Sequence, residues 1–305
     1  MREVRIPAFA KVNLRLEILG ERPDGYHELR TVFQTVSLHD DLRLRASHKR
    51  GILLVIRGNE ALAREPLEKN LVYRAVKALQ LELKLHSGVA IELRKNIPAG
   101  RGLGGGSSDA AAALLGYLRL VGRKLPLSRL AEIAASLGAD VPFFLFGGRA
   151  LGIRCGDEVY PLPDRPRRTV LIVSPSNIHV PTADAYRWLR AQPLFPKRLT
   201  KPALTPKLWK FCALCWSTQE GGLLNDFESP VFQRHRPLAS IKRVLLRQGA
   251  ADASLAGSGS AVFGVFPSPA MARRAALRFP NDQTFVCETL SRERYLRRMN
   301  AARVG

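Results

Sequence analysis

A glycine-rich stretch that leads into a helix is the segment of this 305-residue chain whose residue types most clearly imply chemistry. Residues 100–108 have the sequence Gly-Arg-Gly-Leu-Gly-Gly-Gly-Ser-Ser, and residues 110–121 are rich in alanine and leucine. Glycine lets the backbone adopt positive φ and approach a ligand closely. The N-terminus of a helix adds free N–H groups and a partial positive charge. The pattern therefore predicts an anion site, most naturally for phosphate, where this helix begins.

This loop differs from the best-known phosphate-binding sequences. A Walker A loop needs a lysine before its serine or threonine, and Ser107 stands in that place. Residues 100–105 match the GxGxxG pattern of dinucleotide-binding folds, but residues 120–124 lack the acidic residue expected there. The chain also lacks the His-Arg-Asp and Asp-Phe-Gly motifs of protein kinases. The phosphate site therefore belongs to another class.

Two further segments contain residues suited to phosphoryl transfer. Residues 7–14 are Pro-Ala-Phe-Ala-Lys-Val-Asn-Leu, and residues 254–261 are Ser-Leu-Ala-Gly-Ser-Gly-Ser-Ala. Apolar and polar residues alternate over 12–18, which predicts a half-buried strand. Because side chains on a strand alternate between faces, Lys11 and Asn13 are expected to share the face that points away from the core.

The rest of the pattern predicts the elements that must position these segments. Strands are predicted near residues 42–44, 53–56, 89–93, 169–173, 261–266 and 284–287. Helices are predicted at 70–83, 110–121, 128–137, 183–190, 239–247 and 270–278. Prolines and basic residues in 194–209 indicate a linker or a surface excursion. Strands and helices do not alternate strictly, so we expect an α+β fold with two domains that meet near residues 150–170.

The lysine-bearing strand, the Gly-rich Ser-Ser loop and the late Gly-Ser-Gly-Ser loop, in that order, resemble the three motifs of the GHMP kinases. That superfamily phosphorylates hydroxyl groups of small molecules with ATP. Four segments narrow the resemblance to the family of 4-diphosphocytidyl-2-C-methyl-D-erythritol kinases. They are Ala-Lys-Val-Asn-Leu at 10–14, Arg-Pro-Asp-Gly-Tyr-His at 22–27, Leu-Gly-Ala-Asp-Val-Pro-Phe at 137–143 and Leu-Asn-Asp-Phe-Glu at 224–228. The resemblance extends over most of the chain, from about residue 4 to about residue 290.

The resemblance implies a two-domain GHMP kinase fold with ATP and substrate in the cleft between the domains. Residues 1–165 would form the N-terminal ATP-binding domain, of the ribosomal S5 domain 2 type. Residues 166–305 would form a ferredoxin-like C-terminal domain. The implied reaction is ATP-dependent phosphorylation of the 2-hydroxyl of 4-(cytidine 5'-diphospho)-2-C-methyl-D-erythritol, which gives the 2-phosphate and ADP in the non-mevalonate route to isoprenoids.

The same resemblance implies roles for residues around the acceptor. Asp140 would be the general base on the acceptor hydroxyl. Lys11 would hold that hydroxyl, keep Asp140 ionised and offset the charge of the phosphoryl group. Asn13 would contact the substrate, while Tyr26 would stack on the cytosine ring and His27 would hydrogen-bond to its polar edge.

The implied nucleotide site combines both glycine-rich loops. The triphosphate would be cradled by Gly102, Gly104, Gly105, Gly106, Ser107 and Ser108, with Mg²⁺ as the expected ion. The nucleotide base or nearby substrate would contact Asn70, Lys95 and Asn96. The substrate phosphates would be enclosed by Gly257, Ser258 and Gly259, and Thr182 would lie near the substrate. Asp109 stands where the family often has asparagine, so we expect it to point away from the phosphates as a helix-cap residue.

Composition restricts the remaining possibilities. Hydrophobic residues make up 46% of the chain, but no apolar run suits a bilayer span, and the first residues lack an apolar stretch long enough for a signal peptide. A cytoplasmic enzyme with a small-molecule substrate is therefore expected, as a monomer or homodimer, with no membrane and no obligate nucleic acid as partner. Cys212 and Cys215 form one CxxC without a second ligand pair, so no protein-bound metal site is predicted.

Two alternatives stay open at this level. One is another GHMP kinase, of the homoserine or mevalonate type, and the Tyr26-His27 element argues against it because only a base-bearing substrate needs a stacking ring. The other is a nucleic-acid-binding protein, suggested by the formal net charge of +22. Binding of RNA alone would not require Lys11, Asp140 and two Gly/Ser loops together.

Overall fold

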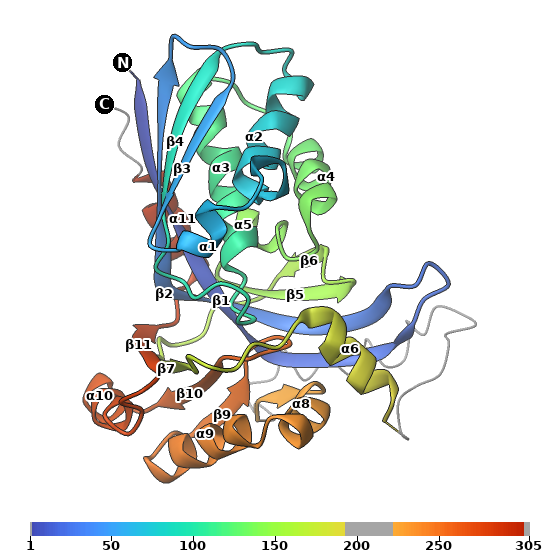
Figure 1. The fold of residues 1–305 in the computed structure, drawn as a ribbon, viewed down its shortest axis with the longest axis vertical. Helices are drawn as coiled ribbons and strands as arrows, with labels where there is room; N and C mark the ends of the chain where they lie inside the picture. The colour runs from blue at the N-terminus through green and yellow to red at the C-terminus, as the bar shows by residue number, and fades with distance from the viewer. Residues whose placement is uncertain (1, 193–221, 302–305) are drawn as a thin grey trace.

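A seven-stranded sheet organises the first half of the chain in the structure, a computed structural model that describes residues 2–192 and 222–301 (Figure 1). Its main strand order is β3-β4-β2-β1-β8, and β5 pairs with β2 and β6. The strands are β1 (Glu3–Glu21), β2 (His27–Ser47), β3 (Ile52–Arg57), β4 (Gly88–Arg94), β5 (Arg149–Arg154), β6 (Glu158–Pro161) and β8 (Leu224–Asn225). The helices are α1 (Glu60–Ala63), α2 (Leu71–Glu82), α3 (Gly105–Val121), α4 (Leu127–Leu137) and α5 (Phe143–Phe146). This sheet and its helices form the first body.

The second body is built on a four-stranded antiparallel sheet with the order β11-β7-β10-β9. Its strands are β7 (Thr169–Ser174), β9 (Asp252–Leu255), β10 (Val262–Phe266) and β11 (Gln283–Glu288). Its helices are α6 (Thr182–Arg190), α8 (Glu228–Arg234), α9 (Arg236–Arg247) and α10 (Pro269–Ala276). The first and third strands in chain order lie at the centre, which is the ferredoxin-like arrangement, so this part of the fold prediction is confirmed.

The hairpin of β1 and β2 joins the two bodies. Near its open end, residues such as Ile6 and Leu44 belong to the core of the first body. Toward its tip, Leu16, Ile18 and Leu29 pack into the core of the second body. Register shifts interrupt the β1–β2 pairing along its length, and the hairpin bends as it crosses from one body to the other (Figure 1). The site between the bodies is therefore built on a continuous pair of strands.

Helix α3 is central to the first body. Gly104, at φ +70°, precedes it and Gly122, at φ +66°, ends it, as glycine commonly does at positive φ. Alanines and leucines along it are buried, and Gly116 lets the helix lie close to the sheet, because a Cβ there would come within 2.8 Å of Leu44 Cδ1. Close packing on the sheet holds the glycine-rich loop, which precedes α3, in a defined place.

The predicted α+β class is confirmed, and each strand and helix named from the sequence is present with shifted ends. One local prediction is corrected. Lys11 and Asn13 do share a face of β1, but that face is buried, with exposed fractions of 4% and 2%. The alternation along β1 predicted a face that points away from the core, whereas on this face Lys11 is covered by first-body groups, among them Phe33 and Asp140. The opposite face, with Ala10 and Val12, packs against the second body.

The chain returns to the first body at its end. Helix α11 (Arg292–Asn300) contains four arginines, and its Tyr295 and Met299 are buried in the core of the first body. Helix α11 was not predicted from the sequence. The short elements α1, α5, α8, β5, β6, β8 and β9 were missed too, since each has few residues to establish a period. The predicted linker at 194–209 and the CxxC cysteines lie outside the described residues. Within residues 2–192 and 222–301, no helix has the length and apolar character to cross a membrane.

Candidate active site

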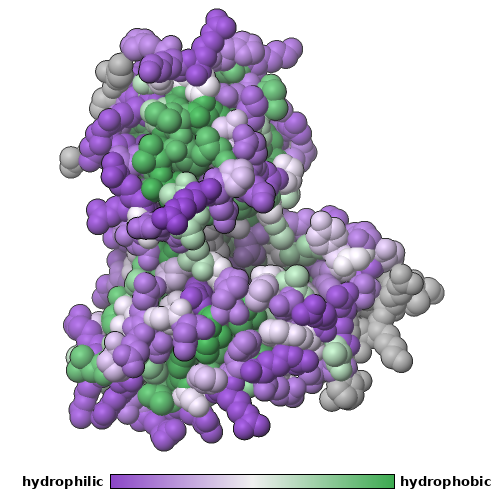
Figure 2. Space-filling view, in the orientation of Figure 1, coloured by the Kyte–Doolittle hydropathy of each residue, from purple (hydrophilic) through white to green (hydrophobic). Residues whose placement is uncertain are grey.

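A cavity of about 730 Å³ lies between the two bodies, where the largely hydrophilic surface narrows to a waist (Figure 2). Most of the residues singled out from the sequence line it. They are Lys11, Asn13, Tyr26, His27, Lys95, Gly102, Gly104, Gly105, Gly106, Ser107, Asp140, Thr182, Gly257 and Ser258. Four others, Asn70, Asn96, Ser108 and Gly259, are not among the lining residues. The structure thus brings together segments that are far apart in the sequence.

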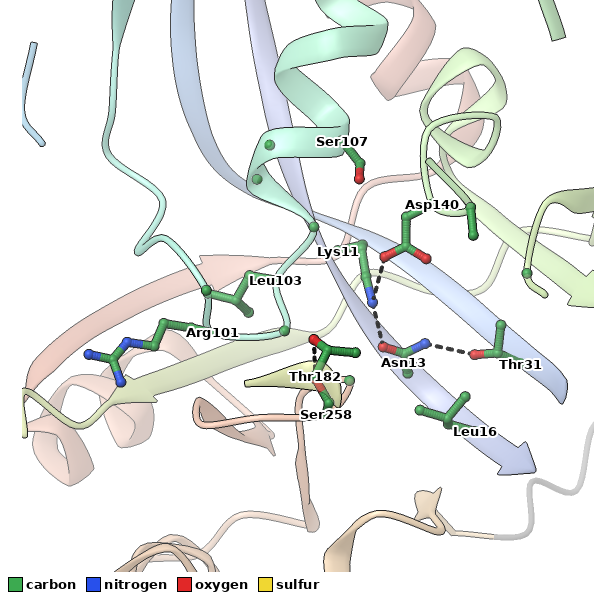
Figure 3. A pocket seen from close by; sticks show the side chains of 18 of the residues that line it. Lys11, Asn13, Leu16, Thr31, Arg101, Leu103, Ser107, Asp140, Thr182 and Ser258 are labelled. Carbon is green, nitrogen blue, oxygen red and sulfur yellow. Dashed lines mark hydrogen bonds and ion pairs between the residues drawn. The ribbon is translucent and has the colours of Figure 1, made fainter. Parts of the chain in front are cut away.

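The glycine-rich loop packs so closely against neighbouring residues that side chains would not fit at two of its glycines. A Cβ on Gly102 would lie 1.8 Å from the Ala256 carbonyl oxygen, and a Cβ on Gly104 would lie 2.9 Å from Phe144 Cζ. Gly104 precedes α3 and provides no side-chain cap, so the N–H groups of the first turn remain available to a ligand. Ser107 lines the cavity beside them, and its hydroxyl points into it (Figure 3). Free amides, a helix N-terminus and a hydroxyl fit a polyphosphate.

Lys11 and Asp140 face each other below this loop (Figure 3). The Lys11 ammonium lies 3.3 Å from Asp140 Oδ2 and donates a hydrogen bond of 2.8 Å to Asn13 Oδ1. The Lys11 side chain is 5% exposed, whereas that of Asp140 is 32% exposed. An ammonium has three N–H donors, so one remains for a ligand after these two contacts. The carboxylate opens into the cavity, where it can accept a proton.

The far arm of the cavity is aromatic. His27 stacks on Tyr186, with ring centroids 4.4 Å apart, and Tyr186 meets Phe227 edge-on at 4.8 Å. Burial, together with the positive charge of Arg190, lowers the pKa of His27, so its ring is neutral near pH 7. A neutral imidazole offers one donor and one acceptor. The arm can therefore hold a flat polar ring.

Tyr26 stands at the tip of the β1–β2 hairpin and is 65% exposed. The turn before it is fixed because Asp24 accepts a hydrogen bond from the Tyr26 N–H and forms an ion pair with Arg22. Tyr186 was not predicted as a site residue, although it lies on a predicted helix four residues after Thr182. That spacing places both side chains on one face of α6, which was a usable signal.

The second Gly/Ser loop docks against the first. Gly257, at φ +54°, approaches the backbone of Gly102, and Arg101 donates a hydrogen bond of 2.6 Å to Ser260 Oγ. The Thr182 and Ser258 hydroxyls lie 3.0 Å apart at the edge of the cavity (Figure 3). Because both loops come together backbone to backbone, a ligand on one loop is also beside the other.

Behind the glycine-rich loop is a buried charge cluster made of Asp40, Lys95 and Asp109. The Lys95 ammonium donates to Asp109 Oδ2 at 2.6 Å and also to Asp40 Oδ2. Burial raises the pKa of Asp109 well above its usual range, against the opposing effect of Lys95. Burial opposes the charge on Lys95, yet Asp109 and Asp40 together raise its pKa.

Three expected roles look different in this setting. Asp109 was expected to cap a helix, but it lies inside α3, buried and bonded to Lys95. Its Oδ1 atom has no hydrogen-bond partner among the described residues. Asn70 caps α2 by accepting a bond of 2.8 Å from the Val72 N–H. Ser108 is buried, and its hydroxyl also lacks a partner in the described part of the chain.

Comparison with known proteins places these features in a family. The family of GHMP kinases N terminal domains matches residues 70–148, and the family described as GHMP kinases C terminal matches residues 212–283. A 4-diphosphocytidyl-2-C-methyl-D-erythritol kinase of Solibacter usitatus is 43% identical over 295 residues, which cover 96% of this chain and 91% of the relative. One of Citrifermentans bemidjiense is 41% identical over 276 residues, covering 90% and 94%.

Solved structures agree with this result. A crystal structure of 4-(cytidine 5'-diphospho)-2C-methyl-D-erythritol kinase has a TM-score of 0.74 and 34% sequence identity, covering 93% of this chain and 98% of the other. A homoserine kinase from Cytophaga hutchinsonii has a TM-score of 0.68 at 22% identity, with 95% of each chain covered. The second likeness indicates a shared fold only.

Proposed function

The chain belongs to the 4-diphosphocytidyl-2-C-methyl-D-erythritol kinases, a family of GHMP kinases, and is an ATP-dependent small-molecule kinase; we propose that it phosphorylates the 2-hydroxyl of 4-(cytidine 5'-diphospho)-2-C-methyl-D-erythritol. The products are the 2-phosphate and ADP, and the step lies in the non-mevalonate route to isoprenoid precursors. One observation supports this most strongly: a single cavity joins the glycine cradle, the Lys11–Asp140 pair and the His27–Tyr186 stack.

In the proposed reaction the acceptor oxygen attacks the γ-phosphorus of ATP. Asp140 takes the hydroxyl proton as the new O–P bond forms, and the bond from the γ-phosphorus to the bridging oxygen breaks to release ADP. Lys11 holds the Asp140 carboxylate in place and directs its remaining N–H toward the acceptor oxygen and the transferring phosphoryl group. This arrangement removes a proton and stabilises the developing negative charge at one place.

The two ends of the cavity have separate tasks. The amides of the Gly104–Ser107 turn hold the phosphates of ATP, and the Ser107 hydroxyl with those phosphates would hold Mg²⁺. When bound, Mg²⁺ would neutralise charge on the phosphate oxygens. At the other end, Tyr26 and Tyr186 stack on the cytosine, and neutral His27 recognises its polar edge.

An ADP-release assay with product mass analysis tests the proposal. Purified protein is mixed with Mg-ATP and one of three acceptors. These are 4-(cytidine 5'-diphospho)-2-C-methyl-D-erythritol (the CDP alcohol), homoserine and mevalonate. We expect the mass of one phosphate to be gained by the CDP alcohol alone. Transfer only to homoserine or mevalonate would refute the proposed acceptor and favour another GHMP activity. Salt-sensitive RNA binding without any phosphate transfer would favour the nucleic-acid alternative suggested by the charge of +22.

A further inference from the structure

The Asn13 amide that holds Lys11 is itself held from behind. Asn13 Nδ2 donates a hydrogen bond of 2.7 Å to Thr31 Oγ1, and Thr31 Oγ1 donates one of 2.7 Å to the main-chain carbonyl of Arg15 (Figure 3 shows the first of these bonds). Thr31 is 1% exposed and lies on β2, across from β1. The contacts form one chain from the strand backbone to the Lys11 ammonium.

The donor and acceptor properties of these groups allow only one direction for this series of hydrogen bonds. A carbonyl oxygen can only accept, so the Thr31 hydroxyl must donate its proton to Arg15. The Thr31 oxygen then accepts from the Asn13 NH₂ group, and this turns Asn13 Oδ1 toward Lys11, which can only donate. The strand register shifts between Asn13 and Arg15, which is the irregularity where the Thr31 hydroxyl meets both residues.

We propose that Thr31 is a positioning residue for phosphoryl transfer. It fixes the orientation of the Asn13 amide, which in turn keeps the Lys11 ammonium facing Asp140 and the acceptor. This rests on the proposed function, because it assigns the Lys11–Asp140 pair to the transfer step. Thr31 borders the cavity, but its hydroxyl is occupied by Asn13 and the Arg15 carbonyl. It therefore acts through Asn13, and its loss should affect turnover more than binding.

Three variants test this role. Thr31→Val removes the hydroxyl with little change of shape, and Thr31→Ser keeps the hydroxyl. Thr35→Val is the matched control, because Thr35 lies on the same strand and is 0% exposed, and within the described residues its hydroxyl has no hydrogen-bond partner. We expect kcat to fall roughly tenfold in Thr31→Val, since a buried amide loses its partner. KM for ATP and for the CDP alcohol should change less than threefold, and Thr31→Ser and Thr35→Val should turn over at near the wild-type rate.

A double-mutant comparison identifies the route of the effect. In an Asn13→Ala background, Thr31→Val should cause little further loss of kcat, because both residues act through one chain. A kcat in Thr31→Val equal to that of the wild type, or an undiminished loss in the Asn13→Ala background, would overturn the proposal. If Thr31→Val proves too unstable at the assay temperature, Thr31→Ala replaces it in the same comparisons.

A measurement on the unliganded protein separates this proposal from the proposed function. The side-chain NH₂ resonances of Asn13, observed in ¹⁵N-labelled protein, should shift in Thr31→Val and stay in place in Thr31→Ser and Thr35→Val. If the wild-type protein does not phosphorylate the CDP alcohol, the proposed acceptor is wrong. The NMR measurement still tests the Thr31–Asn13 hydrogen bond in that case, because it needs no substrate. Unshifted Asn13 resonances in Thr31→Val would refute the positioning role whatever the substrate is.

Discussion

Lys11 and Lys95 lie on opposite sides of the glycine-rich loop. Gly104 lies close to Lys11, and the next residue, Gly105, lies close to Lys95. A Cβ on Gly104 would lie 3.0 Å from Lys11 Cγ, and a Cβ on Gly105 would lie 3.3 Å from the Lys95 ammonium. Lys11 shares the cavity with one half-buried carboxylate, Asp140. Lys95 also lines the cavity, but its ammonium is enclosed by two carboxyl groups with side-chain exposures of 0% and 3%.

The two sites contain the same residue types but differ in how exposed their carboxyl groups are. Solvent exposure, and not residue type, therefore determines the role of each lysine–aspartate contact. In the cavity, solvent reaches Asp140, so the ion pair adds little to folding stability but can exchange a proton and contact ligands. Behind the loop, the charges have left water, and removal of one partner leaves the others buried and uncompensated. The cavity pair is therefore expected to control turnover, and the buried cluster to support the loop.

The largest expected effect is on turnover, from Asp140→Asn. The amide has nearly the same shape but cannot take a proton, so kcat should fall by a hundredfold or more, on the order of 10² to 10⁴. ATP affinity and the melting temperature should stay close to wild type, because Asp140 is the exposed member of its pair. Steady-state kinetics, nucleotide titration and thermal unfolding measure the three quantities. A turnover near wild type would remove Asp140 from the role of base.

Lys95→Met should act on stability instead. It leaves Asp40 and Asp109 facing each other without a cation, and breaking such a buried cluster costs about 3–5 kcal/mol of unfolding free energy. Lys11→Met is the matched control on the other side of the loop, and it should abolish turnover with a much smaller loss of stability. Urea unfolding compares the two. Equal losses of stability would contradict the distinction between the clusters.

Gly104→Ala tests the loop on the Lys11 side. The residue has φ +70°, and the new methyl group would approach both Phe144 and Lys11, so strain of about 1–3 kcal/mol is expected. The amides that face the phosphates should be displaced, and KM for Mg-ATP should rise about tenfold. Gly106→Ala is the control, since its Cβ would meet only Leu71 Cδ1, at 3.7 Å. Steady-state kinetics at varied ATP concentration give KM for Mg-ATP in both variants. An equal rise in KM in both would contradict the specific role of Gly104 in shaping the phosphate site.

The Lys11 site and the glycine-rich loop could be predicted from the sequence, because the patterns that indicate them involve only neighbouring residues. The glycine spacing at 100–106 and the alternation that placed Lys11 beside Asn13 needed only neighbouring residues. The burial of Lys11 could not be predicted, because it results from contacts with groups far away along the chain, among them Gly104 and Asp140. The same holds for Lys95, whose partner Asp40 is 55 residues away and whose position resembled that of a nucleotide contact.

Asp109 offers the smallest and most specific test. Burial, and the neighbouring Asp40, raise its pKa in the folded protein above the unfolded value near 3.8, while Lys95 lowers it. The folded state therefore keeps a proton that the unfolded chain releases as pH rises through that window. Stability from this group is complete below about pH 3.8 and declines as pH rises toward the raised pKa.

Asp109→Asn mimics the protonated acid and removes this dependence. Relative to wild type, the variant should gain stability as pH rises from acid toward neutral, by at most about 1.4 kcal/mol per pH unit. Urea unfolding at a series of pH values measures the difference, and Asp41→Asn, at a side chain that is 57% exposed, is the control that should keep the wild-type slope. If Asp109→Asn keeps that slope as well, the second carboxyl of the buried cluster is ionised in the folded protein. The carboxylates beside Lys11 and beside Lys95 would then both be charged. Burial alone would no longer explain a difference between the two sites.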